Sequence, residues 1–270
     1  MKTLTDHTII YDDECPMCNL YTKAFVKTGM LDANDREAFT EVVNTNIPNI
    51  NWNRARNEIA VINKSDNSVK YGAEGLVHVI GYNFPMFKSL FNLDFVRVLM
   101  SRLYFFISYN RKVIAPGKIF EGDNKCTPDM SYKYRWAYII FLWSITSTVL
   151  AFYSRLLVSL VPESNFVREF LICGGQIIFQ GIIVGLVRRD RWIHYLGNVM
   201  TVSLSGALLL SPAFLLKGFI HSGIFYMSYF MIVVALMFFE HIRRVKILGL
   251  PRFISLTWVI YRFLVLLIIL

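Results

Sequence analysis

The octapeptide Tyr-Asp-Asp-Glu-Cys-Pro-Met-Cys, residues 11–18, contains two cysteines separated by two residues. A short β-type run over residues 8–11 ends where this octapeptide begins, and residues 17–27 have helical character. The cysteines therefore lie where a strand passes into a helix. If Cys15 is the N-cap, Pro16 is the first helical residue, where its missing N–H would have no partner in any case.

This placement gives the two sulfurs different roles. The sulfur of Cys15 faces the free N–H groups and the positive end of the helix, which favours the thiolate. Cys18, three residues further on, shares the same helical face and is close enough to form and break a disulfide with Cys15. We therefore predict that Cys15 is the nucleophile and Cys18 the resolving thiol, with Pro16 and Asp12 in support.

The acidic residues next to the pair oppose the formation of a Cys15 thiolate. Negative charge on Asp12, Asp13 and Glu14 disfavours a nearby thiolate, and the sequence does not say which effect is larger. Asp12 itself has two interpretations. It holds a proton for Cys18 during exchange, or it caps the end of the strand.

Two other interpretations of the cysteine pair stay open. A zinc site needs two further ligands, and the available donors in this half, Cys126, His78 and His7, have no paired spacing. The pair could also be purely structural. Because the C-x-x-C pattern in a cytosolic protein favours redox chemistry, we predict a redox-active disulfide with neither a metal nor a bound organic cofactor.

The remainder of the first half is predicted to form a mixed α/β domain over residues 1–115. Residues 58–63, EIAVIN, are typical of a strand, and residues 69–71 return as its hairpin partner after a polar turn. A helix begins at residue 72 and reaches about residue 80. A second, apolar-rich helix covers residues 92–110, and its apolar part is too short to span a membrane.

The pattern D-x-x-C-x-x-C after a short N-terminal strand resembles the DCC family of thiol-disulfide oxidoreductases, a thioredoxin-like group. Asp12, Cys15 and Cys18 match its signature. The resemblance covers about residues 6–115 and implies a thioredoxin-like α/β fold and thiol-disulfide exchange. Weaker similarities are found at residues 59–61, 71–76 and 109–111.

The second half of the chain has a different composition. Residues 1–135 contain 17 Lys and Arg and 15 Asp and Glu, which leaves 11 and 4 of the totals of 28 and 19 for residues 136–270. The whole chain is 55% hydrophobic with a mean hydropathy of +0.45, too apolar for a disordered or an ordinary soluble protein. We predict a juxtamembrane linker at residues 116–135 and a membrane domain at residues 136–270.

Five apolar segments of the second half come close to the ~20 residues that a helix needs to cross a hydrocarbon core of ~30 Å. We therefore predict an all-α transmembrane helical bundle. Its helices are expected at residues 136–154, 170–187, 193–216, 219–239 and 253–270.

The basic residues between these segments predict the orientation, because Lys and Arg in short loops stay on the cytoplasmic side. Eleven lie on one side and three on the other, which places the first domain in the cytoplasm at a bacterial inner membrane. Because the net charge of +9 comes mostly from these clusters, we expect membrane lipid and no nucleic acid as a partner. The N-terminus lacks an apolar core long enough for a secretory signal. The eleven are Lys118, Lys125, Lys133, Arg135, Arg188, Arg189, Arg191, Arg243, Arg244, Lys246 and Arg252, and the three are Arg155, Arg168 and Lys217.

Several polar residues of the membrane half are candidates for a second site, because polar groups inside spans are costly. One face of the second predicted span carries Gln176 and Gln180, and one face of the third carries His194 and Asn198. The two faces either hydrogen-bond across the bundle or line a site for a small substrate or a quinone headgroup.

Three single residues complete the set of candidates. Arg262 lies in the middle of the fifth predicted span with no acidic residue in the neighbouring segments, so it either pairs with backbone carbonyls or marks a functional site. Cys126 is either a third redox thiol or a free cysteine in the linker. Cys173 lies about 20 Å from the cytoplasmic end of its span, out of reach of the Cys15 pair.

These patterns predict a membrane-anchored thiol-disulfide oxidoreductase of the reductase type that acts on a protein or small-molecule disulfide. Two alternatives belong to other classes. In the first, the membrane half is a carrier or a quinone-coupled electron conduit and the first domain is its redox gate. In the second, the first domain is a non-catalytic binding module on a membrane protein.

Overall fold

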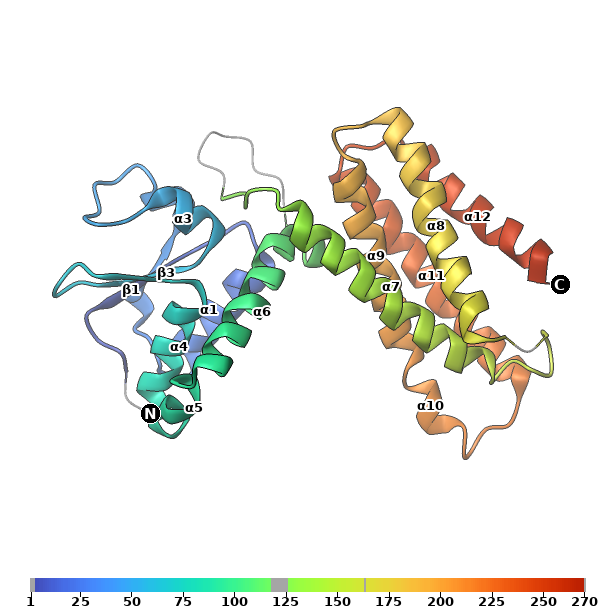
Figure 1. Cartoon of the computed structure of the whole chain (residues 1–270), viewed down its shortest axis with the longest axis horizontal. Helices are drawn as coiled ribbons and strands as arrows, with labels where there is room; N and C mark the ends of the chain where they lie inside the picture. The colour runs from blue at the N-terminus through green and yellow to red at the C-terminus, as the bar shows by residue number, and fades with distance from the viewer. Residues whose placement is uncertain (1–2, 118–125, 163, 270) are drawn as a thin grey trace. The chain divides into compact units, whose positions relative to one another are not determined.

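The computed structural model of the chain describes residues 3–117, 126–162 and 164–269 (Figure 1). It divides into two compact units, Met1–Tyr134 and Arg135–Leu270. Much of the predicted linker, including Lys118 and Lys125, lies outside the described residues.

The first unit is built on a four-stranded mixed sheet in the order β2-β1-β3-β4. Strand β1 is parallel to β2 and antiparallel to β3, and β3 is antiparallel to β4. The strands are β1 (His7–Tyr11), β2 (Arg36–Ala38), β3 (Ala60–Asn63) and β4 (Val69–Tyr71). The α-helices are α1 (Pro16–Lys27), α2 (Phe39–Val42), α3 (Trp52–Asn57), α4 (Gly72–Asn83), α5 (Lys88–Phe91) and α6 (Asp94–Ile114), with 3₁₀ turns η1 (Ala33–Asp35) and η2 (Pro85–Phe87).

Both faces of this sheet are covered, which explains the unbroken apolar runs in its two central strands. Ile9 and Val61, paired across β1 and β3, pack into one cluster together with Cys15 and Cys18. Ile10 and Ile62 point to the other face and pack with a second cluster. The cysteine pair is thus part of the core on one side of the sheet.

The three predicted strands and three predicted helices of this unit are confirmed, with ends shifted by a few residues. The largest shift is in α6, which runs to Ile114 rather than to residue 110. Strand β2 and helix α3 were not predicted. Both are short, three and six residues, and neither has a periodic pattern long enough to detect.

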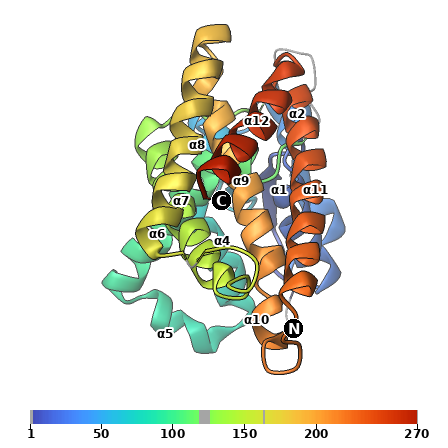
Figure 2. The ribbon, with the colours of Figure 1, turned by 90° about the vertical axis from the view of Figure 1, so that its right-hand side faces the viewer.

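The second unit consists of α7 (Tyr132–Ser154), α8 (Phe166–Val187), α9 (Trp192–Leu210), α10 (Ala213–Leu216), α11 (Gly223–Ile247) and α12 (Phe253–Ile269). Helix α7 starts three residues before the boundary between the units. Helices α8, α9, α11 and α12 run alongside one another (Figure 2).

The described residues contain four helices long and apolar enough to cross a membrane, which confirms four of the five predicted spans. These are α7, α8, the segment Trp192–Leu216 and α11. The fifth predicted span corresponds to α12, whose 17 residues extend about 26 Å at 1.5 Å per residue. This apolar helix begins only after Pro251 and Arg252, and spanning helices range upward from about 17 residues.

Gly72, the first residue of α4, gives a test of how this helix joins the sheet. Its φ is +59°, and a Cβ there would collide with Glu58 Oε2 and come within 3.1 Å of the Tyr104 ring. We expect Gly72→Ala to destabilise the first unit by about 1–3 kcal/mol, the usual cost of such a conformation for a residue with a side chain. The measurement is the temperature at which the first unit of the full chain, in detergent, becomes sensitive to protease.

Gly81 supplies the matched control on the same helix. A Cβ at this position meets nothing within 4 Å, so Gly81→Ala should stabilise the unit by up to about 1 kcal/mol through helix propensity. Equal effects of the two substitutions would contradict the interpretation of Gly72.

Candidate functional site

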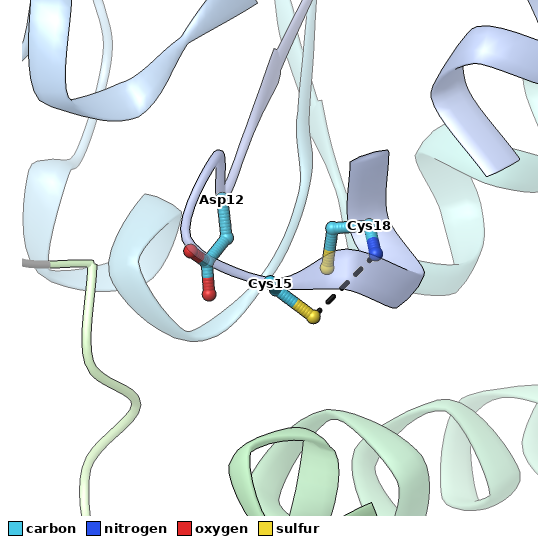
Figure 3. Close-up of side chains that lie close together, drawn as sticks. All are labelled: Asp12, Cys15 and Cys18. Atoms are coloured by element: carbon cyan, nitrogen blue, oxygen red, sulfur yellow. Dashed lines mark hydrogen bonds between the residues drawn. The ribbon is translucent and has the colours of Figure 1, made fainter. Parts of the chain in front are cut away.

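The two cysteines and Asp12 lie together at the start of α1 (Figure 3). Cys15 is the N-cap and Pro16 the first residue of the helix, as predicted. The Cys18 backbone N–H donates a hydrogen bond to Cys15 Sγ, with an N–S distance of 3.4 Å. One ligand atom from each of Asp12, Cys15 and Cys18 lies within 4.8 Å of the others. Both cysteines are free thiols.

This geometry separates the pKa values of the two thiols. Hydrogen bonds from the Cys18 side chain and backbone lower the pKa of Cys15 to about 7, against an opposing effect of burial. The same side-chain hydrogen bond and burial raise the pKa of Cys18. At neutral pH, Cys15 is therefore the sulfur that carries substantial thiolate and Cys18 the one that keeps its proton.

Two basic residues at the end of α6 compensate the acidic residues beside the pair. Arg111 Nε donates to Asp12 Oδ2 at 2.8 Å, and both side chains are buried. Lys112 Nζ donates to Glu14 Oε2 at 2.9 Å. Because these carboxylates carry their own counter-charges, their opposition to a Cys15 thiolate is reduced.

Arg111 has a central position in this part of the unit. Its guanidinium also donates to the backbone carbonyls of Arg56 at 2.8 Å and Cys126 at 3.2 Å. The sequence singled out Arg111 only through the family resemblance and gave it no role, because 99 residues separate it from Asp12. No local pattern signals a contact over that separation.

Cys126 is buried in the core of the first unit, so it is not an exposed cysteine in a linker. Its Sγ lies 3.6 Å from Arg111 Nη2 and 3.7 Å from the carbonyl oxygen of Arg56. Burial raises its pKa to about 12. Cys126 is therefore a protonated core thiol at neutral pH, which does not favour a role as a third redox nucleophile.

The pair is enclosed by the rest of the unit. Cys15 has no exposed surface and Cys18 is 8% exposed. Gly117 packs against the backbone of Glu14 and the ring of Pro16, so closely that a Cβ on it would collide with the Glu14 carbonyl oxygen. A cavity of about 230 Å³ lies beside Cys18. Its lining includes Met17, Tyr21, Leu76, Tyr104, Ile107 and Arg111.

Among the described residues, the site offers fewer ligands than a structural zinc needs. Asp12, Cys15 and Cys18 supply three donors within the described residues, and a structural zinc needs four. The histidines weighed as further ligands face each other, with His7 Nε2 and His78 Nε2 at 3.3 Å.

In the bundle, Gln180 belongs to a hydrogen-bonded network that joins four helices. Tyr195 Oη on α9 donates to Gln180 Oε1 at 2.9 Å, and Tyr195 Oη is also 2.9 Å from His241 Nε2 on α11. His241 Nδ1 lies 3.2 Å from Ser255 Oγ on α12. The partners of Gln180 on α9 and α12 are Tyr195 and Thr257, and the sequence identified neither.

Asn198 faces a different helix. Its Oδ1 accepts a hydrogen bond from Arg244 Nη1 of α11 at 2.9 Å, and its Nδ2 donates to the backbone carbonyl of His194. Arg244 Nε also pairs with Glu240 Oε1 at 2.7 Å. Of these contacts, the one between Asn198 and Arg244 joins two helices, α9 and α11, and the other two lie within a helix.

Arg262 lies with Cys173 and Gln176 at a cavity of about 30 Å³. Its guanidinium is 5.1 Å from the centre of the Trp258 ring. The expectation that its neighbours lack acidic residues is wrong, because α8 begins early enough to include Glu169. A cavity of this size holds about two water molecules, which is too small for a quinone headgroup.

The charges around Cys15 predict opposite shifts of its pKa for two substitutions. Arg111 lowers the pKa of Cys15 and Asp12 raises it, so Arg111→Gln should raise this pKa and Asp12→Asn should lower it. A rise of about one pH unit, the low end for a charge within about 4–6 Å, cuts the thiolate fraction at pH 7 from about one half to about one tenth. The measurement is the pH dependence of Cys15 alkylation in the reduced full chain, by peptide mass spectrometry.

Lys23→Gln, which removes an exposed positive charge from the same helix as Cys15, is the control. It should leave the alkylation profile unchanged. If the alkylation profile shifts in the same direction in both site variants, a general destabilisation of the fold, and not charge, determines the reactivity of Cys15.

No protein-family model, curated protein or solved structure matches this chain.

Proposed function

We propose that this protein is a membrane-anchored thiol-disulfide oxidoreductase in which Cys15 attacks and Cys18 resolves. The observation that carries the proposal is the Cys15 sulfur at the start of α1, which accepts the Cys18 N–H and has a pKa of about 7. A thiol with its pKa near the ambient pH combines thiolate population with nucleophilicity.

The surrounding topology supports a thioredoxin-like interpretation of the first unit. Strands β1 and β2 are parallel and α1 lies between them in the sequence, which makes a β-α-β unit. The C-x-x-C lies at the first turn of that unit. This is the setting in which a cytosolic C-x-x-C is typical of thioredoxin-like redox proteins.

The reaction follows from the separated pKa values. The Cys15 thiolate attacks a substrate disulfide, whose S–S bond breaks as the mixed disulfide forms, and the released substrate thiolate takes a proton from solvent. Cys18 then loses its proton and attacks Cys15, which releases the second substrate thiolate. The substrate gains two electrons and Cys15–Cys18 becomes a disulfide, which an external dithiol reduces again.

Asp12 is placed to take the proton from Cys18. One of its oxygens lies within 4.8 Å of both sulfurs. Arg111 holds Oδ2, whereas Oδ1 is buried without a hydrogen-bond partner among the described residues. Of the two interpretations of Asp12, the proton carrier fits this free oxygen.

Access to Cys15 requires a movement, because its sulfur is buried in the described structure. Gly117 packs on the residues on either side of it, so displacement of this segment is part of the proposed cycle. The basic clusters between the apolar helices favour a cytoplasmic first unit, and in that compartment reduction of substrates is the expected direction.

Trapping tests the mechanism. Cys18→Ser removes the resolving thiol, so mixed disulfides through Cys15 should accumulate severalfold over the wild type in membranes prepared under mild oxidation. Non-reducing electrophoresis followed by mass spectrometry of the adducts measures this. Cys126→Ser, which removes another buried thiol, should leave resolution intact. If Cys18→Ser yields no adduct, or if the adducts survive Cys15→Ser, the proposal fails.

Two exposed apolar residues allow the orientation to be tested. Leu20 on α1 is 72% exposed, and Phe219, between α10 and α11, is 85% exposed. In intact cells a membrane-impermeant maleimide should label Phe219→Cys but not Leu20→Cys, and after lysis it should label both. The reverse pattern would place the redox pair outside the cytoplasm.

A further inference from the structure

The first unit exposes an unusual number of large apolar side chains along one stretch of the chain. All ten are at least 40% exposed, and they fall within 26 consecutive residues of α4, η2, α5 and α6, elements that pack against one another. Large exposed apolar side chains gathered on elements that contact one another mark an interaction site in a soluble domain. We call it the apolar face: Tyr82, Met86, Phe87, Leu90, Leu93, Phe95, Val98, Leu99, Leu103 and Ile107.

Helix α6 has two distinct sides, and this face is the outer one. Phe95, Leu99 and Leu103 recur every four residues, so they line one side of the helix. The opposite side packs on the sheet: Tyr104 Oη accepts a hydrogen bond from the Ile59 backbone N–H at 2.8 Å, and Arg111 reaches Asp12. The exposed side of α6 therefore takes no part in packing the helix on the sheet.

The charges on and beside this face are mostly positive. Lys88, Arg97 and Arg102 are exposed within it, and Asp94 is the one acidic residue between residues 84 and 114. Asp94 is paired with Arg97 at 2.5 Å. Apolar side chains surrounded by Lys and Arg are typical of segments that lie in the headgroup region of an anionic membrane.

We propose that the apolar face lies on the bilayer surface, with Met86 and Phe95, the two most exposed members, inserted among the acyl chains. The chain itself supports lipid as the occupant. Helix α7, which is long and apolar enough to span a membrane, begins at Tyr132, 25 residues after Ile107. The bilayer is therefore always within reach of this face, and positive charge suits anionic headgroups.

Brominated lipids test the proposal directly, because they quench only tryptophans that touch the acyl chains. Phe95→Trp places the probe in the apolar face, and Leu20→Trp places one on α1, outside the face, at a similarly exposed site. Both full-length variants are reconstituted in anionic vesicles with or without lipids brominated on the acyl chains, and the wild-type signal is subtracted.

We expect at least a twofold loss of the Phe95→Trp signal and no loss for Leu20→Trp. If the residue-95 probe is not quenched and its emission is blue-shifted, a protein surface covers the face; if it is red-shifted, water does. Either result overturns the proposal. Equal quenching of both probes would also overturn it, because the whole unit would then be in contact with lipid.

Discussion

The ion pair between Arg111 and Asp12 is the contact on which the first unit depends. It joins the end of α6 to the residue that follows β1, across 99 positions of sequence, with both side chains buried. Burying two charges is costly, and here the cost is offset by the 2.8 Å contact and by hydrogen bonds to the carbonyls of Arg56 and Cys126. Removing one partner of such a pair typically costs about 3–5 kcal/mol.

The same pair sets the electrostatics of the cysteines. A buried carboxylate beside Cys15 would keep its thiol protonated if it had no counter-charge. The guanidinium supplies that counter-charge and leaves one oxygen of Asp12 without a partner among the described residues. Helix α6 therefore has two tasks. Its inner side contributes the charge that lowers the pKa of Cys15, while its outer side carries the apolar face.

The bundle uses polar side chains in a different way. Gln180 and Asn198 lie between helices and hydrogen-bond to residues of α9 and α11, where they satisfy groups that lipid would leave without partners. These contacts fix how α8, α9, α11 and α12 pack. Short α12 is held by the same network, through Thr257 and Ser255.

The sequence by itself determined what depends on neighbours along the chain. The strand before Cys15, the N-cap, Pro16 and the spacing of the two sulfurs are local, and so are the long apolar helices. Only the tertiary structure decided which charge pairs with Asp12, that Cys126 is buried, and which helices Gln180 and Asn198 join. Those outcomes depend on contacts between residues far apart in sequence, which local periodicity does not encode.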